Sequence, residues 1–219
     1  MTWTLHLGDC LEYLRTLPSG SVDAVVTDPP YGINAVKNGR CFGTSNACKT
    51  NTYNPITGDD RPFDPSHLLN VAPIVCLWGA NHYSHMLPKS ACWLVWDKRD
   101  GCKSNPLSDC ELAWVNRDAP ARLFHHRWMG MIRASERGPR VHPSQKPVAL
   151  MEWVLDTLKI PTGATVLDPY CGSGPLGVAC IKTGRNFIGC EISPEYHAIA
   201  TRRLKEAEAA DGLFAGGGT

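Results

Sequence analysis

Four consecutive residues, Asp28-Pro29-Pro30-Tyr31, combine a carboxylate, a rigid backbone and an aromatic ring. The Asp28 carboxylate and the Pro29 carbonyl could accept hydrogen bonds from both N–H groups of an amine. Because proline fixes φ and has no N–H, Pro29 and Pro30 hold that carbonyl in place and add no competing donor. Tyr31 offers a flat face for a planar group. Taken alone, the tetrapeptide fits a plain Asp-Pro turn followed by a core tyrosine equally well.

A second candidate site begins at Asp168, where residues 164–174 have the pattern of a strand, a glycine-containing loop and a helix start. The N–H groups that open a helix favour an anionic group such as a carboxylate. Asp168 at the strand tip can accept from an ammonium group, and Glu191, 23 residues later, can accept from two ribose hydroxyls. Each feature alone is common, but their order favours one ligand with both groups, S-adenosylmethionine.

The two segments together predict a reaction. The nitrogen of an exocyclic base amine is a poor nucleophile, because its lone pair is delocalised into the ring. Acceptors on both of its N–H bonds favour a pyramidal nitrogen whose lone pair points at the sulfonium methyl group. We therefore interpret Asp28 and the Pro29 carbonyl as those acceptors, and Tyr31 as the surface on which an extruded base stacks.

The alternation of apolar runs predicts the elements that position these residues. Asp28, Asp168 and Glu191 each follow or end a short apolar strand. Alternating strands and helices predict a single α/β domain, Rossmann-like and doubly wound, with a mostly parallel sheet covered on both faces. Helices are expected over 10–17, 65–72, 81–87, 147–158, 174–183 and 194–210. Strands are expected over 74–78, 92–96, 110–115, 165–167 and 186–190, and residues 20–31 predict a short strand that ends in a proline-forced turn.

Three segments fall outside this alternation. Residues 32–62 predict a long mobile loop, and residues 212–219 a disordered tail. The segment 116–141 predicts a short basic insertion, because seven basic residues stand against two acidic ones between Arg117 and Lys146. Such a stretch could follow nucleic-acid phosphates, although a solvated loop fits its composition as well. The candidate DNA-binding residues in it are Arg122, Arg127, Arg133, Arg137 and Arg140. Lys98 and Arg99 could face DNA phosphates as well, although plain surface solvation is the alternative.

Composition bounds the remaining possibilities. The 219 residues suit one α/β core, and no apolar run is long enough to cross a bilayer. The first residues lack a signal-peptide pattern, so we expect a cytoplasmic protein without a membrane partner. Ten cysteines are present, but none form a Cys-x-x-Cys pair, so no metal site is expected.

The motifs resemble those of the β-group of DNA amino-methyltransferases, in which the catalytic tetrapeptide precedes the cofactor loop. Residues 28–31 look like the catalytic motif, and residues 168–174, Asp-Pro-Tyr-Cys-Gly-Ser-Gly, resemble the cofactor loop Asp-Pro-Phe-x-Gly-Ser-Gly. Residues 142–147, His-Pro-Ser-Gln-Lys-Pro, match a segment beside the methionine end of the cofactor. Residues 8–10, Gly-Asp-Cys, look like the pair whose aspartate meets the cofactor adenine. The departures are Tyr170 for Phe and Pro175 for Thr.

The resemblance implies a circularly permuted motif order and a set of site residues. The implied catalytic residues are Asp28, Pro29, Pro30 and Tyr31. The implied cofactor-binding residues are Asp9, Cys10, Asp28, His142, Ser144, Lys146, Asp168, Tyr170, Cys171, Gly172, Ser173, Gly174, Glu191 and Ile192. The basic insertion is short for a target-recognition region. Three alternatives follow: the recognised site is short, loop 32–62 shares the reading of DNA, or a second subunit of a homodimer does.

The predicted reaction is methyl transfer to N6 of an adenine flipped out of double-stranded DNA. The tetrapeptide begins with Asp28, which favours adenine in this family, whereas the N4-cytosine branch more often begins with Ser. N4-cytosine methylation is the alternative. Methylation of RNA or of a glutamine side chain is a further hypothesis, although those relatives usually begin with Asn. A DNA-binding module without catalysis is the alternative from another class, and the intact Asp28, Tyr31, Lys146 and Asp168 argue against it.

Overall fold

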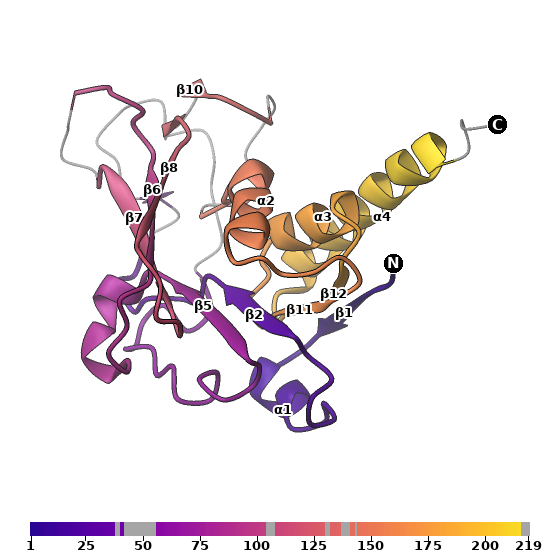
Figure 1. Cartoon of the computed structure of the whole chain (residues 1–219), viewed down its shortest axis with the longest axis horizontal. Helices are drawn as coiled ribbons and strands as arrows, with labels where there is room; N and C mark the ends of the chain where they lie inside the picture. Colours follow the sequence, from indigo (N-terminus) through magenta and orange to yellow (C-terminus); the bar gives the residue numbers. More distant parts are fainter. Residues whose placement is uncertain are drawn as a thin grey trace.

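A mixed eight-stranded sheet forms the centre of the molecule (Figure 1). The computed structural model describes residues 1–37, 40–41, 56–103, 108–129, 132–136, 141–142 and 144–215. In spatial order the strands are β1 (Trp3–Leu7), β12 (Asn186–Glu191), β11 (Thr165–Asp168), β2 (Ala24–Thr27), β5 (Ile74–Trp78), β7 (Cys110–Val115), β6 (Trp93–Asp97) and β8 (Arg122–His125). The first five are parallel, and β7 runs antiparallel to both of its neighbours. The predicted α/β domain with a mostly parallel sheet is confirmed.

Each face of the sheet has its own core. Val26 and Cys76 face a cluster that includes side chains of α2 (Val148–Thr157), α3 (Pro175–Lys182) and α4 (Pro194–Ala215), the orange-to-yellow helices of Figure 1. Val25 and Val75, one position earlier in each strand, face a second cluster with Leu68 and Tyr83. Because the central strands β2 and β5 are buried on both sides, they have continuous apolar sequences. The helix α1 (Cys10–Leu14) contacts β12.

The second face is covered mainly by irregular chain. Residues 65–72, predicted as a helix, form successive turns in which Leu68 N–H donates to Pro65 O and Val71 N–H to Leu68 O. That prediction was wrong, since the bonds found there span three residues and give no α-helical ladder. The helix predicted over 81–87 is two short 3₁₀ helices, Ala80–His82 and Ser84–Met86.

Strand β1 was not predicted, although Trp3, Leu5 and Leu7 alternate with polar residues. It is the edge strand beside β12. At the opposite edge, β8 lies within the predicted basic insertion and pairs with β6. Two small hairpins complete the described strands: β3 (Val36–Lys37) with β4 (Arg40–Cys41), and β9 (Trp128–Met129) with β10 (Ile132–Arg133).

The outer segments are described only in part. Helix α4 continues to Ala215 and so includes the first residues of the predicted disordered tail, while 216–219 lie outside the described residues. Of the predicted loop 32–62, residues 38–39 and 42–55 also lie outside them. Within the described residues, no helix combines the length and the apolar character that crossing a membrane requires.

Candidate active site

The parallel strands bring the predicted acids to one edge of the sheet. Because β12, β11 and β2 are neighbours and run in the same direction, Glu191, Asp168 and Asp28 follow one another along their carboxyl ends. The hydroxyl of Thr27, the last residue of β2, donates to Asp168 Oδ1 at 2.6 Å. Asp28 is the next residue, so this bond joins the two predicted halves of the site. We call residues 28–31 and their partners the acceptor half, and Asp168, Glu191 and the glycine loop 168–174 the cofactor half.

Asp28 belongs to a closed network of charges. Its Oδ2 lies 2.5 Å from Lys146 Nζ, and its Oδ1 accepts a short hydrogen bond from the Tyr31 hydroxyl. Lys146 Nζ is also 2.8 Å from Glu111 Oε2 and 3.4 Å from the Tyr31 hydroxyl. The other Glu111 oxygen lies 3.0 Å from Lys98 Nζ. Two carboxylates and two ammonium groups therefore balance one another in this half of the site.

Burial and pairing shift these groups in opposite directions. Burial raises the pKa of Asp28, against the effect of Lys146. Burial alone would raise the pKa of Glu111 too, but Lys146 and Lys98 lower it to about 2. Burial would lower the pKa of Lys146, and its two carboxylates raise it instead. Glu111 and Lys146 thus stay charged throughout the physiological pH range.

Two neighbours, His82 and Gly79, hold the Tyr31 ring in place. His82 stacks on it with ring centroids 4.9 Å apart and planes 13° from parallel. Gly79, at φ 68°, lies so close that a Cβ there would come within 1.9 Å of the ring, so only glycine fits. At most one face of Tyr31 is left for a base.

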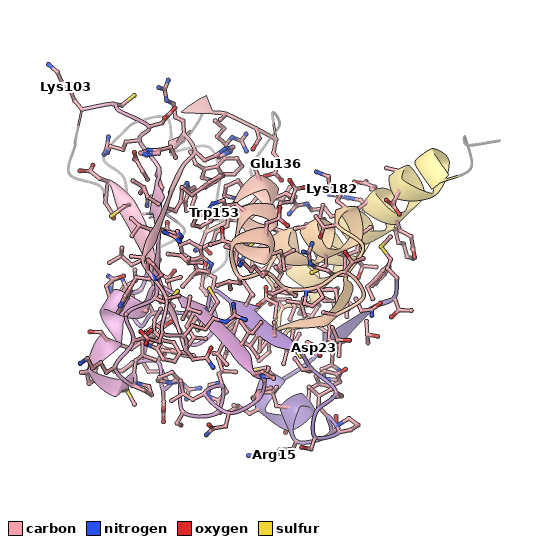
Figure 2. All side chains as sticks on the ribbon, in the orientation of Figure 1. Arg15, Asp23, Lys103, Glu136, Trp153 and Lys182 are labelled. Atoms are coloured by element: carbon pink, nitrogen blue, oxygen red, sulfur yellow. The ribbon has the colours of Figure 1, made fainter. Side chains whose placement is uncertain are left out.

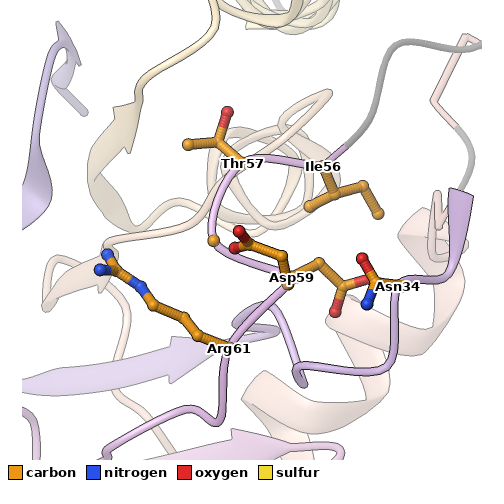
Figure 3. A pocket seen from close by; sticks show the side chains of 7 residues that line it. Asn34, Ile56, Thr57, Asp59 and Arg61 are labelled. Carbon is orange, nitrogen blue, oxygen red and sulfur yellow. The ribbon is translucent and has the colours of Figure 1, made fainter.

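A buried carboxylate that the sequence did not single out holds the backbone after the tetrapeptide. Asp59 Oδ1 accepts from the N–H groups of Tyr31, Gly32 and Ile33 at 3.1, 2.9 and 3.1 Å, and Oδ2 accepts from Ala35 N–H at 2.6 Å. Figure 3 shows Asp59 in the pocket that Asn34, Thr57 and Arg61 also line. Four N–H groups converging on one carboxylate fix the loop that carries Tyr31.

The cofactor half holds two acids, Asp168 and Glu191. Asp168 accepts from the Thr27 hydroxyl and from Tyr170 N–H at 3.1 Å, and burial raises its pKa to about 7. Glu191 accepts from Gly172 N–H at 2.9 Å and Ser193 N–H at 2.8 Å, and burial raises its pKa as well. Among the described residues, no lysine or arginine forms an ion pair with either acid.

The glycine loop is braced from the basic segment. Gly174, at φ 74°, precedes α3, and Pro175 is the first residue of that helix. Arg203 donates to the carbonyl and the hydroxyl of Ser173 at 2.8 and 3.0 Å, and it pairs with Glu136 at 2.8 Å. Glu136 also accepts from Val148 N–H at the start of α2, beside which Figure 2 labels it.

The remaining predicted cofactor residues surround this loop. His142 is buried against Tyr196, and its ring would lie 3.4 Å from a Cβ at Gly172. The backbone N–H of Ser144 donates to His142 Nδ1 at 3.2 Å. Cys10 and Cys171 are buried, and the Tyr170 hydroxyl lies 3.0 Å from His67 Nε2. Asp9 caps α1 by accepting a hydrogen bond from Leu11 N–H. Ile192 is 46% exposed. Lys146 is the exception, since its described contacts are with the acceptor half.

Three of the five predicted DNA-binding residues, Arg122, Arg127 and Arg133, lie in the described part of the basic segment. Arg122 is exposed on edge strand β8, Arg133 lies 5.1 Å from the Trp128 ring centroid, and Arg127 contacts Asp100. Arg137 and Arg140 lie outside the described residues. Arg99 and Lys98 were expected to face DNA, but Arg99 is buried and pairs with Asp109, and Lys98 pairs with Glu111. That expectation was wrong, because each cation is paired with an acid of the protein and Arg99 is buried as well.

This fold and the carboxyl-edge site define a protein of the methyltransferase class. Residues 94–202, about half of the chain, match the N6/N4 methyltransferase family, described as DNA methylase, and the chain belongs to that family. The matched segment includes the glycine loop and His142. The tetrapeptide lies outside it.

Relatives and solved structures extend the comparison. YubD of Escherichia coli (strain K12) is 28% identical over 93% of this chain and 90% of its own length. The DNA adenine methyltransferase YhdJ of the same organism is 46% identical over 66 residues, 30% of this chain and 22% of its own. The fold is shared with M1.HpyAVI complexed with SAM (TM-score 0.58, 22% identity, 93% and 99% covered). It is also shared with the cytosine-N4-specific PvuII DNA methyltransferase (TM-score 0.59, 17% identity, 100% and 94% covered).

Proposed function

We propose that the chain transfers a methyl group from S-adenosylmethionine to N6 of an adenine extruded from double-stranded DNA. The observation that carries this proposal is the contact between the strand tips of β2 and β11. Thr27, next to Asp28, donates to Asp168, which brings the amine-accepting group and the cofactor-binding acid together. A transfer reaction needs donor and acceptor sites at such close range.

The residues of the cofactor half fit a cationic ligand. Asp168 is buried, Glu191 is partly buried, and burial raises the pKa of both. An ammonium group beside Asp168 would stabilise its charged form. Asp168 would hold that ammonium group, Glu191 the ribose hydroxyls, and the start of α3 the carboxylate. Ile192, exposed beside Glu191, offers an apolar surface for the adenine ring. When bound, S-adenosylmethionine supplies an electrophilic methyl group on its sulfonium.

The acceptor half orients the amine. Asp28 Oδ2 and the Pro29 carbonyl accept from its two N–H bonds, which leaves the nitrogen lone pair free for the methyl group. Tyr31 holds Asp28 through its hydroxyl and offers the base the ring face that His82 leaves free. Asp59 keeps Tyr31 in register by binding the N–H groups around it.

Two observations favour adenine over cytosine. The tetrapeptide begins with Asp28, and YhdJ, a DNA adenine methyltransferase, is 46% identical over its matched segment. The second candidate is N4 of cytosine, which the shared fold of the cytosine-N4-specific PvuII enzyme favours. Both amines present the same pair of N–H donors to Asp28 and Pro29.

Nucleoside mass spectrometry tests the proposal. Unmethylated plasmid DNA is incubated with the protein and S-adenosylmethionine, digested, and analysed beside a reaction with Asp28→Ala. We expect N6-methyladenine with the wild-type protein and none with the variant. N4-methylcytosine without N6-methyladenine would replace adenine by cytosine as the target. No methylated base with any DNA would contradict the proposed activity.

A further inference from the structure

Lys146 pairs with Oδ2 of Asp28, the oxygen that would accept a hydrogen bond from a target amine. Its Nζ lies 2.5 Å from Asp28 Oδ2, 2.8 Å from Glu111 Oε2 and 3.4 Å from the Tyr31 hydroxyl. Two of these three oxygens belong to carboxylates, so Lys146 is an ion-pair partner of both Asp28 and Glu111. The Lys146 side chain is 5% exposed.

An amine and an ammonium group compete at Asp28, because both are donors. A cation that stayed on Asp28 would also lie beside a nitrogen that becomes positive as the methyl group arrives, which raises the energy of that step. Lys146 therefore has to yield part of its contact with Asp28 when the base binds. A buried ammonium group moves only where another anion receives it.

Glu111 is that second anion, already in contact. It lies on β7, whose other residues are apolar or uncharged, and it shares Lys146 with Asp28 as an ion-pair partner. Lys98 binds its other oxygen at 3.0 Å and so keeps it charged and oriented. A small rotation of the flexible Lys146 stem is enough to strengthen one contact and weaken the other.

We propose that Glu111 is a positioning residue that draws Lys146 off Asp28 when the target amine is bound, with Lys98 holding Glu111 in place. The inference rests on the proposed function and adds to it a specific role for three charged side chains. It accounts for a partly buried acid, Glu111, that pairs with two lysines, one of which also pairs with a carboxylate that has to stay open to a neutral amine.

Single-turnover methyl transfer to plasmid DNA, at saturating S-adenosylmethionine, tests this role. Glu111→Gln keeps the shape of the side chain but leaves Asp28 as the only carboxylate for Lys146. We expect the transfer rate to fall about tenfold or more, while the affinity for S-adenosylmethionine changes less than about twofold. Glu152→Gln is the matched control, because Glu152 also pairs with a lysine, Lys182, at 2.5 Å, but on the exposed surface. Its transfer rate should equal that of the wild type.

Two further variants separate positioning from folding. Lys98→Met removes the anchor of Glu111 and should slow transfer by a smaller factor, about threefold. In a Lys146→Met background, Glu111→Gln should cause no further loss of rate, since it acts through Lys146. These variants carry the test if Glu111→Gln alone does not fold.

Opposite results overturn the inference. A Glu111→Gln protein as fast as the wild type, or one that loses rate and cofactor affinity by the same factor, contradicts it and leaves the proposed function standing. Additive losses of rate in the Lys146→Met background do the same. A wild-type protein that methylates no DNA overturns the proposed function and this inference with it.

Discussion

The two halves of the site carry opposite electrostatic designs, although they lie on neighbouring strands. In the acceptor half, Asp28 and Glu111 are neutralised by Lys146 and Lys98. In the cofactor half, Asp168 and Glu191 accept hydrogen bonds from a hydroxyl and from backbone N–H groups, no lysine or arginine of the described residues pairs with them, and burial raises the pKa of both. One half brings its own cations, and the other leaves acids for a cation that the ligand brings.

The difference matches the charges of the two ligands that we propose. A base amine is neutral, so Asp28 needs a resident cation to remain ionised in a buried place. S-adenosylmethionine carries an ammonium and a sulfonium group, so a resident lysine beside Asp168 would compete with it. An acid without a cationic partner in the free protein lowers the free energy of unfolding, and binding of a cationic ligand restores that stability.

The largest expected effect comes from removing the acceptor. Asp28→Ala should lower the rate of methyl transfer at least about 100-fold, because the amine loses its orienting carboxylate. Cofactor affinity should fall less than about tenfold, since Asp168 and Glu191 remain. Radiolabel transfer and calorimetric titration measure the two quantities.

Asp23→Ala is the matched control for that variant. Asp23 precedes the other end of β2 and accepts from Thr165 N–H at 2.7 Å, away from the carboxyl edge (Figure 2). Its rate of transfer should stay close to that of the wild type. Equal losses in both variants would mean that Asp28 acts through the fold of β2 alone.

Asp168→Asn should separate binding from stability. A charge-assisted hydrogen bond to the ammonium group is lost, so the affinity for S-adenosylmethionine should fall about 10- to 100-fold. Burial raises the pKa of Asp168 to about 7 in the folded protein. The stability that the protonated carboxyl contributes is therefore lost as the pH rises from the ordinary pKa of an aspartate through about 7.

The amide, which cannot ionise, should therefore raise the Tm of the ligand-free protein at about pH 8 by a few degrees and leave it unchanged near pH 4. Thermal unfolding over this pH range measures the effect. A variant that is less stable than the wild type at high pH would show that Asp168 has a cationic partner in the free protein.

Asp59→Ala tests how rigidly the acceptor loop is held. Four N–H groups between Tyr31 and Ala35 lose their acceptor, so we expect a Tm lower by several degrees and a transfer rate lower by about tenfold. Cofactor affinity should be unchanged. Asp60→Ala, at the exposed neighbouring position, is the control, and the same losses there would exclude a specific role of Asp59.

The smallest effect is expected at the sheet edge. Arg122→Ala should weaken DNA binding a few-fold. The slope of the logarithm of the binding constant against the logarithm of the salt concentration should fall by about the amount of one phosphate contact. Arg15→Ala, an exposed arginine near α1, should change neither (Figure 2). Binding isotherms at several salt concentrations distinguish them, and unchanged slopes for Arg122→Ala would place the DNA path elsewhere.

Local sequence patterns were sufficient for the parts of the site that follow from strand ends. Asp28, Asp168 and Glu191 each end an apolar run, and parallel strands place such ends together. The partners of these acids depend on tertiary contacts that no local pattern carries. Lys146 has the same sequence context whether it contacts the cofactor or Asp28, and Asp59 resembles any acid in a polar loop. Glu111 gave a weak signal, as an acid inside an otherwise apolar strand.

Proton release on cofactor binding tests the contrast between the two halves most directly. Calorimetric titration with S-adenosylmethionine, in buffers of different ionisation enthalpy, counts the protons exchanged. Because an ammonium group beside Asp168 lowers its pKa from about 7, binding should release a substantial fraction of a proton near that pH and almost none at about pH 8.5. Tight binding without proton release near pH 7 would contradict the account, because it would mean that the cofactor half is already charged and paired before the ligand arrives.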